Sequence, residues 1–242
     1  MNEDLQLSKL SLKDLDNVIA LQNKIIANLP DEQKYFTLHR SKEDFAKALS
    51  SSNLHMFGIY VGKTLVAQSI LNFPEDGCPR DIPEFAKEYK NSEIAIYQAV
   101  LVDPDYRGMG LMKRMLQARE DMAAFCGKKI AICKIAAANH FSWKNALKHG
   151  MQIVSAGIDA SGHEKLYLQK KLNTPAVKIL SPQPRVLISL QHKNLSKLMY
   201  NMGKIGQIGI WDKENATLAY IPSKQNSFGP ILKNCRQPAP GY

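Results

Sequence analysis

Residues 102–120, VDPDYRGMGLMKRMLQARE, carry the most informative pattern in the chain. An apolar strand leads into a tight turn containing Arg107, Gly108 and Gly110, and an amphipathic helix follows at once. Glycines let the backbone adopt conformations in which several main-chain N–H groups converge. The start of a helix adds unpaired N–H donors and the positive end of its dipole. The stretch therefore predicts an anion-binding turn, with phosphate as the usual ligand.

The length of 242 residues suits one domain with an appendage, or two small domains. No run approaches the roughly 18 to 20 apolar residues that cross a bilayer, and the opening MNEDLQLSKL is too polar for a secretion signal. We therefore expect a cytoplasmic protein with no membrane partner. The four cysteines are scattered without a Cys-x-x-Cys pair, which favours reduced structural thiols and predicts no metal site.

The formal charge of +10 is unevenly distributed along the chain. Residues 173–242 hold nine lysines and arginines against two carboxylates, and so account for +7 of it. These cations are spread singly, whereas a nucleic-acid-binding arm concentrates them in dense runs. A solvated basic surface is therefore favoured over a nucleic-acid partner.

Apolar periodicity predicts an α/β protein in which strands and helices alternate around a mixed sheet. Strands are expected over 5–10, 94–102 and 128–136, with hairpins over 55–73 and 151–172. Helices are expected over 15–29, 41–49, 111–125 and 140–148. In the third helix the buried stripe is expected to consist of Leu111, Met115, Ala118, Met122 and Phe125.

The prolines between residues 175 and 184 mark a boundary, so we expect two units, residues 1–172 and residues 173–242. The second unit contains too many apolar residues for a disordered tail, and alone it could bury little surface. We expect it to form a small α+β extension that docks on the first unit or on a second subunit. Its glycines at 203, 206 and 209 are expected to lie in a strand with close backbone approach.

Two familiar phosphate-binding motifs are absent from residues 102–120. A Walker loop needs Gly-x-x-x-x-Gly-Lys-Ser/Thr, and the third glycine of a dinucleotide fingerprint falls here at Lys113. The remaining pattern resembles the GNAT superfamily of acetyl-CoA-dependent N-acetyltransferases, whose signature is Arg or Gln, two residues, Gly, one residue, then Gly or Ala. Arg107 and Gly110 match this signature, and Met112 stands at its last position.

A second motif is similar to the same family. Residues 139–142, Asn-His-Phe-Ser, and residues 148–151, Lys-His-Gly-Met, resemble the family's Asn-led helix that ends in Gly-Phe. The resemblance covers about residues 5–172 and stops before the C-terminal extension. It implies a GNAT-like acetyltransferase fold and an enzyme that moves an acetyl group from acetyl-CoA to a primary amine. A homodimer is compatible with it.

The resemblance also implies a set of cofactor-binding residues. In the family the pantetheine arm lies between two splayed strands and pairs with backbone as an added strand would. Backbone N–H groups of the glycine turn hold the pyrophosphate. Carried over by position, the set is Val100, Leu101, Val102, Arg107, Gly108, Met109, Gly110, Leu111, Met112 and Asn139.

The catalytic residues follow less directly from the pattern. Many family members use as general acid a tyrosine seven residues after the Asn, but Ala146 stands there in this chain. Ser142 is a candidate by position, with Tyr97 as an alternative, although such residues are more often structural. Glu93, at the start of the strand that leads to the turn, is the candidate base. His140 and His149 flank the second motif and are further alternatives.

The long connection over 73–93 holds six carboxylates and three cations in an otherwise basic protein. If it lies over the acceptor end of the site, it favours a cationic amine; the competing interpretation is a solvated loop. Two other functions stay open. Ala146 is compatible with a catalytically weak acetyl-CoA-binding regulatory module, and the basic C-terminal segment with nucleic-acid binding.

Overall fold

The computed structural model describes residues 4–75, 86, 88–173, 186–213 and 215–221. The strands are β1 (Leu5–Lys9), β2 (Leu54–Val61), β3 (Thr64–Asn72), β4 (Ile94–Val102), β5 (Ile130–Ala136), β6 (Gln152–Ile158), β7 (Glu164–Lys171), β8 (Val186–Ile188), β9 (Ile208–Asp212) and β10 (Thr217–Ile221). The helices are α1 (Leu15–Ala27), α2 (Lys42–Ser50), α3 (Leu111–Phe125), α4 (His140–Lys148) and α5 (Leu195–Lys204). Short 3-10 turns are η1 (Leu12–Asp14), η2 (Asp31–Phe36), η4 (Asn91–Glu93) and η5 (Pro104–Tyr106). The predicted class, a mixed α and β protein, is confirmed.

The strands form one sheet in the order β1-β2-β3-β4-β5-β7-β6-β9-β10-β8. Among the strand pairs of the described residues, β4 and β5 alone run parallel. They are joined through α3, the crossover that a parallel pair requires. The glycine turn therefore lies at the carboxyl end of β4, the first strand of the parallel pair.

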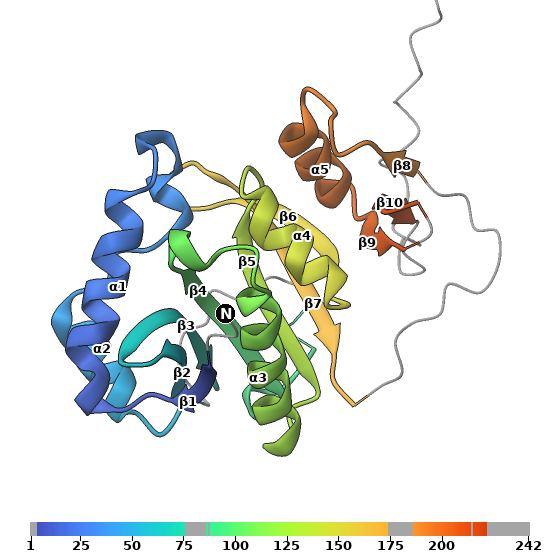
Figure 1. Ribbon diagram of the computed structural model, residues 1–242. Coiled ribbons are helices and arrows are strands. Elements are labelled where there is room, and N and C mark those ends of the chain that lie inside the picture. Colours follow the sequence, from blue (N-terminus) through green and yellow to red (C-terminus); the bar gives the residue numbers. More distant parts are fainter. Residues whose placement is uncertain (1–3, 76–85, 87, 174–185, 214, 222–242) are drawn as a thin grey trace, which may run out of the picture.

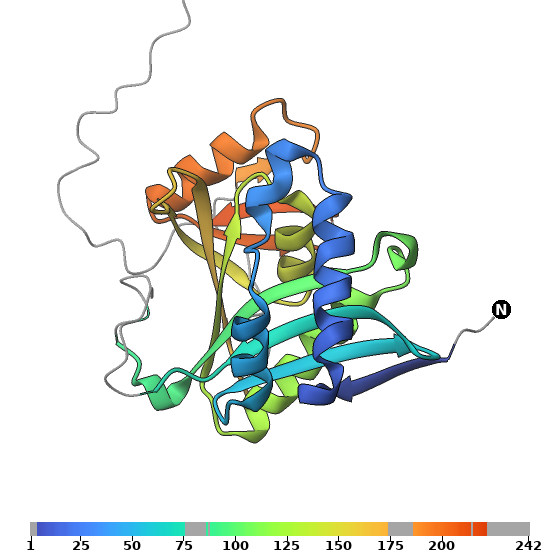
Figure 2. The ribbon, with the colours of Figure 1, turned by 90° about the vertical axis from the view of Figure 1, so that its left-hand side faces the viewer.

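The sheet separates two layers of helices (Figures 1 and 2). Successive side chains of a strand point to opposite faces, so neighbours enter different cores. Met56 of β2 packs with α1 and α2, whereas the next residue, Phe57, packs with α3 and α4. Ile70 and Leu71 of β3 divide in the same way.

The buried stripe of α3 differs from the one that the periodicity predicts. Phe125 is 86% exposed, so its expected burial is wrong. The buried residues are Leu111, Met115, Leu116, Arg119 and Ala123. Because positions four apart share a helix face, Arg119 continues the stripe of Met115 and stands where an apolar residue is expected.

The C-terminal strands continue the sheet beyond β6 through the pair Ile153↔Gly209. Helix α5 packs against β6, and Met199 of this helix belongs to the same core cluster as α3 and α4. The single strand expected for the three glycines is wrong, because Gly203 lies in α5 and Gly206 in a turn with φ of +75°. Close approach does occur at Gly203, where an added Cβ would lie 2.9 Å from the Cβ of Ala156.

Candidate functional site

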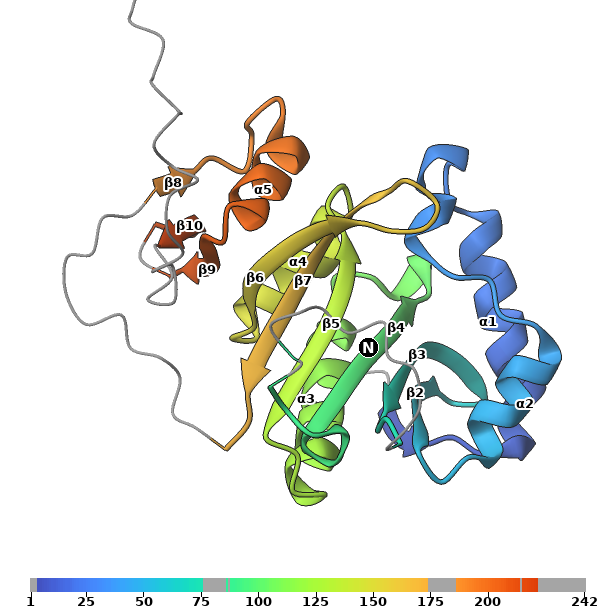
Figure 3. The ribbon, with the colours of Figure 1, turned by 180° about the vertical axis from the view of Figure 1, so that it is seen from behind.

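Strands β4 and β5 pair along only part of their length. Their ladder runs from Ile94↔Ile130 to Ile96↔Ile132, while β4 continues beside β3 and β5 continues beside β7. A register shift against β3 follows, with Ile70 opposite Gln98 and Ser69 opposite Val100. Such a bulge bends the strand that carries the extra residue. The two strands consequently diverge toward their carboxyl ends (Figure 3).

A cavity of about 1010 Å³ occupies the space between the diverging strands. Its walls include residues 96–101 of β4 and 132–136 of β5, with side chains from α3 and α4. On another side it is bounded by residues 35–40, after α1, and by the β6–β7 hairpin, where Tyr35 stacks on His163 at a ring-centroid distance of 4.1 Å. The volume is at the upper end of the range typical of small-molecule and cofactor sites.

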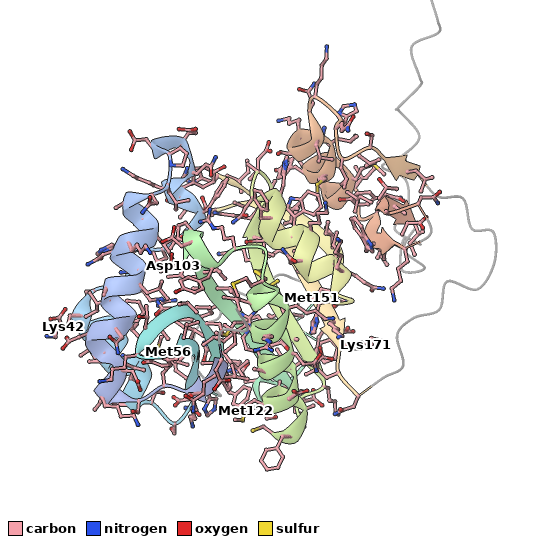
Figure 4. All side chains as sticks on the ribbon, viewed as in Figure 1. Lys42, Met56, Asp103, Met122, Met151 and Lys171 are labelled. Carbon is pink, nitrogen blue, oxygen red and sulfur yellow. The ribbon has the colours of Figure 1, made fainter. Side chains whose placement is uncertain are left out.

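The chain beyond β4 is anchored by Asp103, which is 2% exposed and lies beside α1 (Figure 4). One carboxylate oxygen accepts from the N–H of Asp105 at 3.1 Å, and the other accepts from Lys24 Nζ at 2.8 Å. The carboxylates of Asp103 and Asp105 raise the pKa of Lys24 to about 12, and the hydrogen bond to Asp103 is the larger cause. The main-chain N–H of Asp103 donates to the carbonyl of Val66. These contacts hold the start of the glycine turn against the sheet.

The turn itself needs glycine for its backbone conformation. Gly108 has φ of +83° and Gly110 has φ of +74°, in the left-handed region. A Cβ at either position would meet no atom within 4 Å, so packing does not demand glycine there. Gly110 is the N-cap of α3 and has no side chain to satisfy the first N–H groups of the helix. The helix end is thus open to an approaching anion.

The residues expected to bind the cofactor fall into two groups. Four of them, Val100, Leu101, Met112 and Asn139, line the cavity. The others lie at its edge or in the turn and are not among its described lining residues; they are Val102, Arg107, Gly108, Met109, Gly110 and Leu111. The side chain of Leu111 is buried in the core, which leaves its main chain for any ligand contact.

The start of α4 forms another wall of the cavity. The side chain of Asn139 caps this helix by accepting from the N–H of Ser142 at 3.1 Å. Ser142 and Ala146 line the cavity one turn apart, and Trp143 is fully buried behind them. Ala146 stands where many family members have a tyrosine. On this wall, Ser142 is the residue with a hydroxyl group that lies nearest to Ala146 in the sequence.

Tyr97 of β4 presents a second hydroxyl. Its side chain lines the cavity, and its buried oxygen has no hydrogen-bond partner among the described residues. The guanidinium of Arg119 lies 4.6 Å from the ring centroid and donates to the carbonyl of Gln98 at 2.8 Å. Burial raises the pKa of Tyr97, lowers that of Arg119 to about 10, and raises that of Cys133 to about 12. The cavity thus contains a protonated phenol beside a buried cation.

The structure does not bring Glu93 together with Ser142. Glu93 precedes β4 at the end where β4 and β5 are paired, and it forms an ion pair with Lys129 that lowers its pKa. It is not among the described lining residues of the cavity. His140 and His149 are also not among the described lining residues. His140 shares a hydrogen bond with Ser196 Oγ, and Nε2 of His149 lies 2.5 Å from Glu120 Oε2.

Sequence reasoning missed two cavity residues, Arg119 and Arg40. The signal for Arg119 was present, since a cation at a core position of an apolar helix stripe is unusual. Arg40 lies in a connection whose path has no local signature. Most of the acidic connection, residues 76–85 and 87, lies outside the described residues; of its carboxylates, Glu75 lines the cavity.

Among the described residues no group of three His, Cys, Asp or Glu side chains could hold a metal ion. The free thiols described are Cys126, which is exposed, and Cys133. Within the same part of the chain, no helix has the length and apolar character needed to cross a bilayer.

Comparison with known proteins gives a match to a family model and matches to solved structures. The model of the acetyltransferase (GNAT) family matches residues 23–151. The ribosomal-protein-S18-alanine N-acetyltransferase from Escherichia coli is 14% identical with a TM-score of 0.51, over 73% of this chain and 99% of that one. A probable acetyltransferase from Staphylococcus epidermidis ATCC 12228 is 16% identical with a TM-score of 0.56, over 69% and 98%.

A third solved structure contains coenzyme A. It is the PaiA N-acetyltransferase from Thermoplasma acidophilum, 16% identical with a TM-score of 0.50, over 69% of this chain and 99% of that one. At such identities these structures show a shared fold. A comparison with curated protein sequences gave no match.

Proposed function

The chain belongs to the acetyltransferase (GNAT) family, and from this membership we propose that it transfers an acetyl group from acetyl-CoA to a primary amine. The observation that carries the proposal is the divergence of β4 from β5 over a large cavity, beside an open helix N-terminus. An extended amide-containing arm can pair with the unpaired backbone edge of β4 as an added strand does. The N–H groups of the glycine turn suit a pyrophosphate.

The residues that would hold acetyl-CoA follow from this arrangement. The main chain of Val100, Leu101 and Val102 offers the strand edge. The turn and the first turn of α3 offer N–H groups from Arg107, Gly108, Met109, Gly110, Leu111 and Met112. Asn139 keeps α4 in position at the cavity wall by capping it.

Acetyl transfer forms a carbon–nitrogen bond and breaks the carbon–sulfur bond of the thioester. The amine loses a proton, and the departing thiolate gains one. Tyr97 is the donor we propose, because burial keeps its hydroxyl protonated and that hydroxyl lines the cavity without a partner among the described residues. Ser142 is the alternative donor. The proton that the amine loses after attack passes through water to the Tyr97 phenolate that remains once the thiolate is protonated, so the step balances without a separate base. Glu93, held by Lys129, is not used as a base here.

The second candidate is an acetyl-CoA-binding regulatory module with little catalysis, which the absence of a hydroxyl at Ala146 favours. Mixing the purified protein with acetyl-CoA and a panel of primary amines separates the two. We expect release of free thiol that depends on the amine. Calorimetric binding of acetyl-CoA with no amine-dependent thiol release would establish the regulatory module instead.

We also propose a cytoplasmic location, which rests on the scattered spacing of the cysteines, without a Cys-x-x-Cys pair. A homodimer remains compatible with the proposal. Neither affects the chemistry at the cavity.

A further inference from the structure

Arg40 is held in one place by a buried glutamine. Gln22 of α1 is 1% exposed, and its amide Nε2 donates to the carbonyl of Arg40 at 2.9 Å. Its Oε1 accepts from the N–H of Arg40 at 3.0 Å. Both main-chain groups of Arg40 are thus clamped by one side chain, which fixes the direction in which the arginine leaves the backbone.

The guanidinium of Arg40 has donors to spare. Its Nη2 donates to Gln98 Oε1 at 3.0 Å, and its buried Nε has no partner among the described residues. No described carboxylate forms an ion pair with it, since Asp44 is engaged in capping α2 through the N–H of Ser41. Burial lowers its pKa, so the charge is held against a desolvation penalty. A partly buried cation without a close counter-ion is less stable than one that an anion reaches.

Arg40 and Arg119 approach the same residue of β4 from the two faces of the sheet. Arg40 binds the side chain of Gln98, and Arg119 binds its carbonyl. Arg119 comes from α3, which begins at the glycine turn. Arg40 follows η2, on the face covered by α1 and α2, where residues 35–40 meet the β6–β7 hairpin. Arg40 therefore reaches the cavity from the face of the sheet opposite α3 and the glycine turn.

The charged side chains that line the cavity are mostly positive, like Arg40. Five lysines and arginines but only two carboxylates are among its described lining residues. Of the carboxylates, Asp159 lies 3.2 Å from Lys165 Nζ, and Glu75 accepts from the side-chain amide of Asn53. The pantetheine arm and the thioester are uncharged, and the cofactor's phosphates belong at the glycine turn. The excess of cations is thus not needed by the cofactor at this end.

We propose that the acceptor amine carries an anionic group, a carboxylate by preference, and that Arg40 binds this group beside Gln98. The inference rests on the proposed acetyl transfer and narrows its substrate class. A guanidinium donates two parallel hydrogen bonds to a carboxylate, a geometry that a lysine does not match. This class is opposite to the cationic amine that the acidic connection favours.

The test compares acceptors that differ only in the charge of one group. Unbranched amino acids of increasing length are assayed beside their carboxamides and the diamines of matching length. For the best chain length we expect the acid to have a kcat/KM roughly ten- to a hundredfold above the amide. Arg40→Met should lower kcat/KM for the acid to about the value for the amide and so remove the preference, and Arg40→Lys should restore part of it.

Lys42→Met is the matched control. Lys42 lies two residues further on, its side chain is 64% exposed at the outer edge of the molecule (Figure 4), and it does not line the cavity. The substitution removes the same charge and should preserve the preference. Thermal melting of each variant checks that it is folded.

The outcomes separate this inference from the function on which it rests. Amides or diamines that react as well as the acids, or a preference that survives in Arg40→Met, would overturn the anion subsite and leave acetyl transfer standing. If no amine is acetylated, the proposed acetyl transfer is refuted. The anion subsite is then tested by calorimetry, which measures binding of the acid and the amide to CoA-saturated protein. Binding of the acid that is weakened by Arg40→Met supports it, and equal binding of acid and amide refutes it.

Discussion

At the scale of single residues, two polar groups on the cavity walls lack partners among the described residues. The hydroxyl of Tyr97 and the Nε of Arg40 are both buried and unpaired among the described residues. Orphaned buried groups are rare because each loses its hydrogen bonds to water. Both lie on the walls of one cavity, and we propose that a bound ligand completes their hydrogen bonds.

The role of Tyr97 can be tested by removing one atom. Tyr97→Phe keeps the ring beneath Arg119 but deletes the hydroxyl, so we expect normal folding and a kcat lowered about a hundredfold or more. Ser142→Ala is the matched control and should change kcat little. Stopped-flow or steady-state thiol release measures both. A large loss in Ser142→Ala with none in Tyr97→Phe would transfer the role to the serine.

The pH profile gives a second measurement on the same group. Burial raises the pKa of Tyr97 above the ordinary phenol value of about 10. The phenol therefore stays protonated in the folded protein across the neutral and mildly alkaline range. An alkaline loss of kcat that comes from this group should begin only above about pH 10.

At the scale of elements, the start of α3 combines a left-handed glycine with an open helix end. A side chain at Gly110 would strain a backbone with φ of +74° and would occupy the open space through which we propose that a phosphate approaches. The N–H groups of the turn belong to the main chain, so removing the side chain of Arg107 leaves them in place.

We expect Gly110→Asp or Gly110→Val to weaken acetyl-CoA binding by at least about tenfold, equal to about 1.4 kcal/mol, and far more than Arg107→Ala. Gly62→Asp controls for strain alone, since Gly62 also has a positive φ and open space but lies in the β2–β3 turn. Isothermal calorimetry gives the affinities. Equal affinity for wild type and Gly110→Asp would refute the assignment of the turn.

At the scale of the whole molecule, we propose that residues 173–242 form an extension docked on the acetyltransferase unit of residues 1–172. The described part of the extension contacts β6 through α5 and β9. Gly203 permits this contact, because an added Cβ would lie 2.9 Å from Ala156 and 3.2 Å from the backbone of Ser155. A side chain there must push the helix away from the strand.

Gly203→Val is therefore expected to lower the free energy of unfolding by about 1–3 kcal/mol. Asn201→Val places the same side chain at an exposed position of the same helix and should have little effect. Urea denaturation measures both variants. Equal midpoints for the two would argue that the extension does not pack against β6.

Much of this protein is determined by local sequence. Alternation within β2 and β3, the caps at Ser41 and Asn139, and the glycine turn all act over a few residues, because side-chain periods and turn conformations are local properties. The order of elements, the glycine turn with its expected anion-binding role, and the resemblance to the GNAT family followed from these patterns.

Which residues line the cavity was decided by the tertiary structure. The register of β4 against β3 and its short ladder with β5 determine where the strands part, and these pairings join residues far apart in the chain. Glu93 falls at the paired end and is tied to Lys129, whereas Arg40 and Arg119 meet at Gln98 from opposite faces. Periodicity within one segment contains no information about such meetings, because they depend on how separate segments pack together.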